Sequence, residues 1–314
     1  MNRGRRAMPN VVITPRSYGV YSPDIWKDWK DAGFEVIAEP GPLPEERLAE
    51  LLAEADALLV GTDVVSRHVL ERSPTLKVIA KYGVGVDNIA VDYAKERGIS
   101  VFNTPGVNTE AVADYAFGLI LSLARNIPGS HADLMDGKWK KAVGREIWSK
   151  TIGILGLGSI GKALARRAKG FNMQVLAYDL YPDHKFANEH GVMFADFETV
   201  IRSSDVISVH LALTPDTRHL IGAKELEWMK EETLLINTAR GGIVDEDALF
   251  EALSRNRIAG AALDVFQVEP PIASPLRKLN NVILTPHNAS ASVEAIKRMT
   301  EQSTEQIMRF YSHK

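Results

Sequence analysis

The stretch TIGILGLGSIGKALARRAKGF, at positions 151–171, decides the fold of this chain. It opens with an apolar run up to Leu155 that is typical of a strand buried on both faces. It continues with Gly156-Leu-Gly158-Ser-Ile-Gly161 and ends in a segment with apolar residues at helical spacing. A strand before and a helix after are the context in which the GxGxxG pattern indicates a dinucleotide-binding turn.

Each glycine of this turn answers a geometric need. Gly156 permits the tight turn, Gly158 lets the backbone approach a pyrophosphate, and Gly161 lets the helix pack closely on the strand. The amide groups around Ile160 and Gly161, at the start of the helix, then face the negative charge of the ligand. The alternative is a glycine-rich turn that binds nothing.

An acidic residue, Asp179, ends the next apolar run, QVLAYDL at positions 174–180. A carboxylate there accepts hydrogen bonds from ribose hydroxyls and repels a 2′-phosphate, and no arginine follows it directly. The sequence therefore predicts that the cofactor is NAD rather than NADP.

Short apolar runs alternate with amphipathic stretches along the whole chain, which is typical of βαβα units and predicts an α/β fold with two doubly wound parallel-sheet lobes. The runs lie at 11–15, 34–38, 57–61, 76–83 and 99–103, and then at 151–158, 174–180, 206–213, 233–239, 260–266 and 281–287.

Two long helices are expected to connect the lobes, at 109–126 and at about 290–310. The chain then leaves the first lobe and returns to it, so we expect domains at 1–103 plus 288–314 and at 104–287. The helix at 109–126 has almost no polar face. We expect it to be buried between the lobes or across the two-fold interface of a homodimer.

Composition excludes several classes of function. The chain has 314 residues and a net charge of −3, so it lacks the basic field that attracts nucleic acid or an anionic membrane surface. It has no cysteine, which excludes disulfides and thiolate metal sites and fits a reducing cytoplasm, and we expect no metal. No apolar run reaches the ~18 residues of a membrane helix, and the VVIT after the basic amino end is too short for a secretory signal.

Polar residues follow three strands of the second half: Thr238-Ala239-Arg240, then Asp264 with Glu269, then Thr285-Pro-His287. Ligands of doubly wound sheets bind beyond the carboxyl ends of the strands, so these residues should converge on the cofactor. Arginine binds a carboxylate as a rigid fork, and a carboxylate beside a histidine stabilises the protonated ring that donates a proton. The alternatives are a surface arginine, an exposed loop acid and a capping histidine.

From about residue 55 to 300 the chain resembles the D-2-hydroxyacid dehydrogenase family. The matching strings are KYGVGVDNI, NTPGVNTEAVAD, GILGLGSIGKALA, INTARGGIVDEDAL, GAALDVFQVEPP and LTPHNAS. The resemblance implies a Rossmann cofactor domain and a flavodoxin-like substrate domain. It also implies that His287 is the general acid/base, Glu269 its partner, and Arg240 the anchor of the substrate.

Further roles come from this resemblance alone. It implies that the Val84-Gly85 backbone holds the substrate carboxylate and that Asn108 lies near the substrate. Thr238 with Ala239 and Asp264 would line the nicotinamide and its ribose.

The nature of the hydroxy acid stays open at this point. The strings match best the phosphoglycerate dehydrogenase-like subgroup, but Val60-Gly61-Thr62-Asp63 lacks the arginine often found there and has a carboxylate instead. Phosphoglycerate, glycerate or hydroxypyruvate, sulfolactate and lactate-like acids all remain. The alternative from another class is an NAD-sensing, non-catalytic corepressor-like protein on the same fold.

Overall fold

The structure is a computed structural model that describes residues 8–312. The chain divides into two compact units, Met1–Asn108 with Ala291–Lys314 and Thr109–Ser290. Both boundaries fall a few residues later than expected. The reason is local, because Thr104 is hydrogen-bonded to Gly83 of the first unit and Ala289 to Asp264 of the second.

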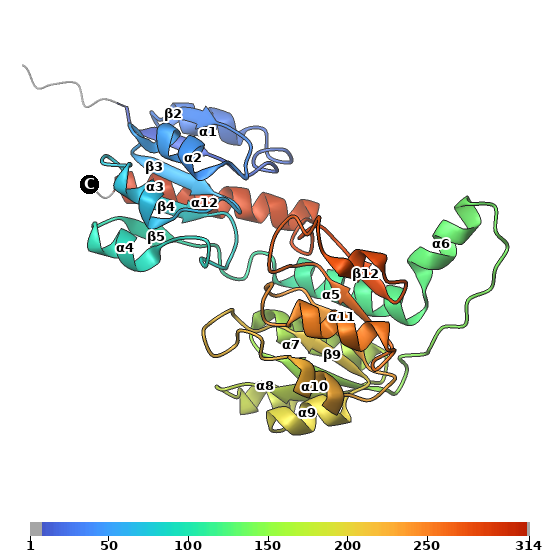
Figure 1. The fold of residues 1–314 in the computed structure, drawn as a ribbon. Coiled ribbons are helices and arrows are strands. Elements are labelled where there is room, and N and C mark those ends of the chain that lie inside the picture. Colours follow the sequence, from blue (N-terminus) through green and yellow to red (C-terminus); the bar gives the residue numbers. More distant parts are fainter. Residues whose placement is uncertain (1–7, 313–314) are drawn as a thin grey trace, which may run out of the picture. The chain divides into compact units, whose positions relative to one another are not determined.

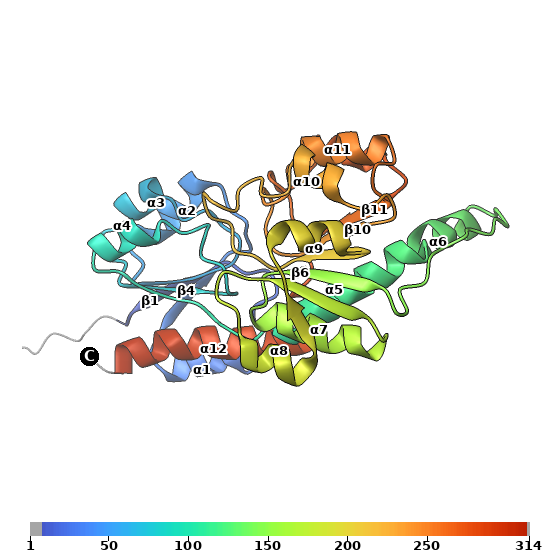
Figure 2. The ribbon, with the colours of Figure 1, turned by 90° about the horizontal axis from the view of Figure 1, so that it is seen from below.

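The first unit is built on a five-stranded parallel sheet with the order β2-β1-β3-β4-β5, the flavodoxin-like order. Its strands are β1 (Asn10–Ile13), β2 (Glu35–Ala38), β3 (Ala57–Val60), β4 (Val78–Lys81) and β5 (Ser100–Phe102). Its helices are α1 (Ile25–Asp31), α2 (Glu45–Leu52), α3 (Arg67–Glu71), α4 (Val91–Glu96) and α12 (Val293–Ser312). Figure 2 shows α1 and α12 on one face of the sheet and α2, α3 and α4 on the other.

The second unit is built on a seven-stranded parallel sheet with the order β12-β11-β10-β9-β6-β7-β8. Its strands are β6 (Thr151–Leu155), β7 (Gln174–Tyr178), β8 (Val192–Phe194), β9 (Val206–Val209), β10 (Leu234–Asn237), β11 (Gly260–Leu263) and β12 (Val282–Leu284). From β6 the chain adds β7 and β8 on one side, and it then returns to add β9 on the other side of β6. The position between β6 and β9 is therefore the switch point where such sheets bind ligands.

Helices cover both faces of this second sheet. The helices of the second unit are α5 (Thr109–Ala124), α6 (Ile127–Met135), α7 (Ser159–Gly170), α8 (His184–His190), α9 (Phe197–Ser203), α10 (Ala223–Trp228) and α11 (Glu246–Ser254), and a 3₁₀ turn spans Pro275–Lys278. Helices α5, α7 and α8 lie on one face and α9, α10 and α11 on the other (Figure 2). The central strands β9, β10 and β11 are therefore buried on both sides, which explains why their sequences are apolar throughout.

The expected environment of the apolar helix α5 was wrong. Its side chains Phe117, Leu119 and Ile120 are buried in the core of the second unit, where α5 packs on α7, β10 and β11. The helix therefore lacks a polar face because its own unit covers it, and it need not lie between the lobes or at a dimer interface.

Two elements were not predicted from the sequence. Helix α6 starts after Asn126, which has a left-handed backbone, and it contains Pro128 and Gly129. Strand β8 is a three-residue edge strand paired with β7 alone. No helix within residues 8–312 is long and apolar enough to cross a membrane.

Candidate active site

The glycine-rich turn lies between β6 and α7 and has the shape of a dinucleotide cradle. Gly156 has a φ of +94°, and a Cβ there would overlap the His210 carbonyl group. A Cβ at Gly161 would overlap the carbonyl oxygen of Gly156. Gly158 is the N-cap of α7, no side chain caps that helix end, and the space where its Cβ would lie is open. The first-turn amides, around Ile160, are therefore left for an anionic ligand.

Asp179 is anchored beside this turn. Its Oδ2 accepts a hydrogen bond from the Leu157 amide at 2.7 Å, and its Oδ1 accepts one from the Tyr181 amide at 2.8 Å. The nearby cation Lys162 is paired with Asp183 at 2.5 Å. A fixed carboxylate after β7 and a neutralised lysine on α7 fit the ribose of NAD better than a 2′-phosphate.

The end of β10 shapes the turn that carries Arg240. The Asn237 side chain accepts from the Ala239 amide at 3.0 Å and donates to the Arg240 carbonyl at 2.9 Å. The hydroxyl of Thr238 is buried and has no hydrogen-bond partner among the described residues. This buried hydroxyl lies at the same edge of the sheet as the glycine-rich turn, and a bound cofactor would supply its missing hydrogen-bond partner. The residues present therefore fit NAD.

Asp264 holds the turn that carries His287. It is fully buried, and its carboxylate accepts from the Thr285 hydroxyl at 2.6 Å and from the Asn288 and Ala289 amides at 2.8 Å each. Its carbonyl accepts from the His287 amide at 2.9 Å. Burial raises the pKa of Asp264, although these hydrogen bonds oppose the shift. The structure thus places Asp264 beneath the turn, and a contact of its side chain with the nicotinamide stays a prediction.

His287 and Glu269 form a pair, with Nδ1 of the ring 2.8 Å from Oε2 of the carboxylate. Both side chains are about one third exposed, at 34% and 35%, so solvent or a substrate can reach them. Burial opposes ionisation of Glu269, but the hydrogen bond and charge of His287, the Phe266 amide and the charge of Arg240 together lower its pKa. Since Nδ1 faces Glu269, Nε2 is the ring nitrogen that can exchange a proton with a substrate.

A second histidine of this sheet edge, His210, cannot replace His287 as the acid. Its Nε2 lies 2.8 Å from the Ser208 hydroxyl, and burial lowers the pKa of His210 to about 4. The ring is therefore neutral near pH 7.

In the first unit, the Val84-Gly85 loop presents free amide groups. Gly83 has a φ of +139° and is held at both its amide and its carbonyl by Thr104, and the Val84 carbonyl accepts from Asn103 at 2.7 Å. Within the part of the chain that the structure describes, the Val84 and Gly85 amides have no hydrogen-bond partner. Such a loop can bind a carboxylate. Asn108, which ends this unit, has a buried side-chain oxygen without a partner.

Asp63, the carboxylate in the loop after β3, faces into the first unit. It is 1% exposed, and its carboxylate accepts from the Thr14 hydroxyl at 2.5 Å and the Leu43 amide at 2.8 Å. The exposed charge at this edge is Arg16, after β1, whose Nε donates to the Gly41 carbonyl. Asp63 is therefore structural, and Arg16 is the charged group to consider for specificity.

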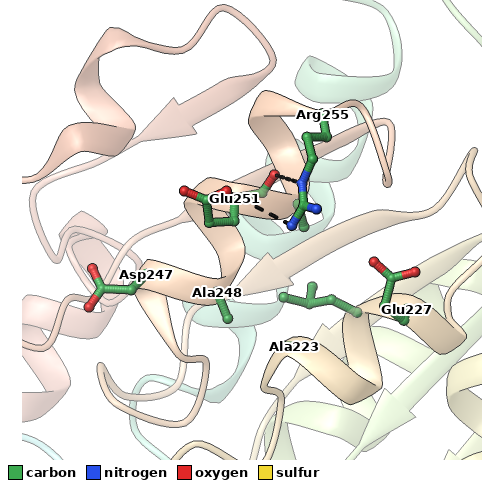
Figure 3. Close-up of a pocket in the computed structure, with 8 residues that line it drawn as sticks. Ala223, Glu227, Asp247, Ala248, Glu251 and Arg255 are labelled. Atoms are coloured by element: carbon green, nitrogen blue, oxygen red, sulfur yellow. Dashed lines mark hydrogen bonds and ion pairs between the residues drawn. The ribbon is translucent and has the colours of Figure 1, made fainter.

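A hollow between α10 and α11 (Figure 3) is not part of this constellation. None of the predicted site residues lines it, and Glu251 and Arg255 at its rim form an exposed pair with each other. The described residues also contain no group of three acidic or histidine side chains that could hold a metal ion.

Three residues have a positioning role that was not predicted from the sequence. Asn237, Thr285 and Thr104 each fix the turn or loop beside a predicted site residue. A polar residue directly at the end of an apolar strand was the available signal, and it did not distinguish a residue that holds a turn from one that binds a ligand.

Comparison with known proteins agrees with this geometry. Residues 117–289 match the family model described as D-isomer specific 2-hydroxyacid dehydrogenase, NAD binding domain. The chain is 44% identical over 300 residues to glyoxylate reductase of Thermococcus litoralis, covering 92% of this chain and 87% of that protein. It is 40% identical to hydroxypyruvate reductase of Thermotoga maritima, covering 88% and 90%. It is 44% identical to D-3-phosphoglycerate dehydrogenase of Methanocaldococcus jannaschii, covering 84% of this chain and 51% of that protein.

A solved structure with a bound cofactor is also similar. The NAD complex of the NAD-dependent formate dehydrogenase from Staphylococcus aureus superposes with a TM-score of 0.86 at 31% identity, covering 98% of this chain and 96% of that one. All of these relatives have enzyme names, so the non-catalytic alternative is not favoured. This chain belongs to the D-2-hydroxyacid dehydrogenase family, with NAD as its cofactor and small 2-hydroxy acids as the substrates of the family.

Proposed function

We propose that this dehydrogenase reversibly reduces a small, unphosphorylated 2-oxo acid of the glyoxylate or hydroxypyruvate kind. The observation that carries the proposal is the His287–Glu269 pair, 2.8 Å apart and open to solvent, beside the Arg240 turn. Together these groups supply a proton donor and a carboxylate anchor, the two functions that 2-oxo acid reduction requires.

The proposed roles balance the reaction. When bound, NADH would supply the hydride that the carbonyl carbon needs. His287 Nε2 gives its proton to the carbonyl oxygen, so that a 2-hydroxy acid is formed. Glu269 accepts from Nδ1 and stabilises the imidazolium before transfer. The Arg240 fork binds the substrate carboxylate and carbonyl oxygen, which a lysine would not reproduce.

The remaining site residues are proposed to bind the two reactants. The free amides of Val84 and Gly85 would bind the substrate carboxylate, with Asn108 nearby. Gly156, Gly158, Ile160 and Gly161 would bind the pyrophosphate and Asp179 the adenosine ribose. Thr238, Ala239 and Asp264 would line the nicotinamide end, where the unpartnered Thr238 hydroxyl supports a contact.

Two features support an acid without a phosphate. The loop Val60-Gly61-Thr62-Asp63 offers no cation. The relatives named above include a glyoxylate reductase and a hydroxypyruvate reductase, whose named acids carry no phosphate. Arg16, exposed at the same sheet edge, favours a second candidate, an acid with a further anionic group such as 3-phosphoglycerate.

We also propose the cytoplasm as its compartment. A chain without cysteine gains nothing from an oxidising environment.

The first prediction concerns the substrate. With NADH, glyoxylate or hydroxypyruvate should be reduced with a kcat/KM at least about tenfold above that of 3-phosphohydroxypyruvate, a difference of about 1.4 kcal/mol. Loss of absorbance at the reduced-nicotinamide band measures each rate. A preference for the phosphorylated acid that Arg16→Gln abolishes would replace the proposal by the second candidate.

The second prediction concerns the cofactor. Asp179→Ala should weaken NADH binding and relieve repulsion of NADPH, so that the ratio of the two Kd values changes by about tenfold. Fluorescence titration with both cofactors measures this ratio. Asp196→Ala, which removes the carboxylate that caps α9 elsewhere in the unit, is the control and should leave the ratio unchanged.

The third prediction concerns the proton donor. Reduction needs a proton on His287 Nε2, and the Glu269 carboxylate holds the ring at Nδ1, 2.8 Å away. Glu269→Gln should lower kcat by about tenfold, because a neutral amide holds Nδ1 less firmly than a carboxylate. His287→Ala should lower kcat by ~10² to 10⁴ at every pH and leave NADH binding within about twofold. An unchanged kcat in Glu269→Gln would show that Glu269 does not act on His287.

We further propose that the chain assembles as a homodimer through α6 and the segment that follows it. Helix α6 has no buried residue, and Figure 1 shows it standing away from the sheet of its unit. Large apolar side chains are exposed along this region: Ile127, Leu134, Met135, Trp139, Val143 and Trp148. A second copy of the chain would cover them.

The fourth prediction is the mass in solution. Light scattering at micromolar concentration should give twice the chain mass of 34.6 kDa. Met135→Glu combined with Trp139→Glu should yield the monomer, because two charges would have to be buried. Met193→Glu, at an exposed position of edge strand β8, should leave the dimer intact. A wild-type monomer would reject the proposal.

A further inference from the structure

The peptide that joins Phe266 and Gln267 connects the three proposed catalytic residues. The Phe266 amide donates to Glu269 Oε1 at 3.1 Å, and Glu269 in turn binds His287. Gly241, directly after Arg240, packs so closely on the same peptide that a Cβ there would overlap the Phe266 carbonyl and approach the Gln267 amide. A shift of this peptide would therefore move both Glu269 and the Arg240 turn.

The carboxylate of Glu246 holds this peptide from the start of α11. Its Oε1 accepts a hydrogen bond from the Gln267 amide, 21 residues away in sequence. Glu246 is half-buried, whereas residues 267–270 are exposed. The loop that carries Glu269 thus has little packing of its own, and the contact with Glu246 ties it to a helix.

A second contact acts on the same residue. The Gln267 side-chain amide is hydrogen-bonded to the His219 ring, and the His219 amide donates to the Gly242 carbonyl at 2.7 Å. The ring also lies 3.6 Å from Asp245, the residue that caps α11. Gln267 is therefore held at its backbone by Glu246 and at its side chain by His219.

Glu246 also belongs to the charge environment of the catalytic pair. The carboxylates that act on it are Asp245 and Asp247 on its own helix and Glu269 on the facing loop. Burial, together with these charges, raises the pKa of Glu246 against the opposing hydrogen bond from Gln267. The positive or titratable groups around this loop are His219, His287, Arg240 and, near Gly242, Arg218.

We propose that Glu246 is a positioning residue of the enzyme, which fixes the Phe266–Gln267 peptide and through it the carboxylate of Glu269 and the turn of Arg240. The inference rests on the proposed roles of Arg240, Glu269 and His287. An error of about 1 Å in the placement of such groups can lower a rate by ~10²-fold. The hydrogen bond from the Gln267 amide to Glu246, called the clamp below, fixes an exposed loop and should therefore have a large effect on turnover.

Two substitutions separate the two properties of Glu246. Glu246→Ala removes the acceptor, and we expect kcat to fall by about 10- to 100-fold while the Kd of NADH stays within about twofold. Glu246→Gln keeps an acceptor oxygen but removes the charge. We expect it to retain kcat within about threefold, because the Gln267 amide keeps its acceptor.

Asp247→Asn is the matched control, since it removes a charge one residue away on an exposed side chain without touching Gln267. Its kcat should equal that of the wild type. Hydrogen exchange followed by mass spectrometry supplies a readout that does not depend on turnover, and peptides covering 264–271 should exchange faster in Glu246→Ala but not in Glu246→Gln.

The outcomes are distinct. Unchanged kcat and unchanged exchange in Glu246→Ala would overturn the clamp, and so would equal losses in both variants together with weaker NADH binding and a lower Tm, which indicate a general structural role. Should the alanine variant fail to fold, Glu246→Asp, which keeps the carboxylate but shortens its reach, takes its place, and unchanged kcat and exchange there would overturn the proposal. A wild-type protein that reduces none of the oxo acids would overturn the proposed function, while the exchange comparison would still test the clamp.

Discussion

Parallel strands place all their carboxyl ends along one edge of a sheet, and the proposed site depends on that constraint. In the second unit the turns after β6, β10, β11 and β12 bring the glycine-rich cradle, Arg240, Glu269 and His287 to one edge of the sheet, although together they span positions 156 to 287 of the chain. The packing of helices on both faces leaves only the edges open to ligands. Chemistry is therefore confined to the loops, and the apolar strands serve to hold those loops in register.

Buried acids hold these loops more than they act on ligands. Asp264 fixes the His287 turn through three hydrogen bonds, and Asp63 ties the loops after β1, β2 and β3 to one another. A carboxylate can accept several hydrogen bonds at once, so one such side chain can order a turn that has no regular structure. Its removal would leave amide groups unpaired inside the protein, and this cost explains why charged groups are kept at buried positions.

The fold was largely readable from the sequence because every strand of a doubly wound sheet is a continuous apolar run. Each of the eleven predicted runs contains a strand, but the runs at 151–158 and 206–213 continued past strands that end at Leu155 and Val209, since the turns that follow are also apolar. Strand β8 was not predicted because an edge strand of three residues has too short a hydrophobic pattern to be recognised. Helix α6 was not predicted because Pro128 and Gly129 are unfavourable residues in a helix. The surroundings of α5 could not be predicted, because an apolar helix does not indicate which element covers it.

Within the site, the same limit separates residues that were found from those that were not. Arg240, Glu269 and His287 stand out because each has a side chain suited to the chemistry at the end of a strand, and the structure brings Glu269 and His287 within 2.8 Å. Asp264 and Asp63 carry the same chemical group, yet they face inward, which depends on hydrogen-bond donors distant in sequence. Glu246 shows the difference most clearly: its partner is a backbone amide, and no side-chain pattern records where a backbone amide will lie. Sequence therefore identifies groups that can react, whereas the groups that position them become visible only when the loops are folded against one another.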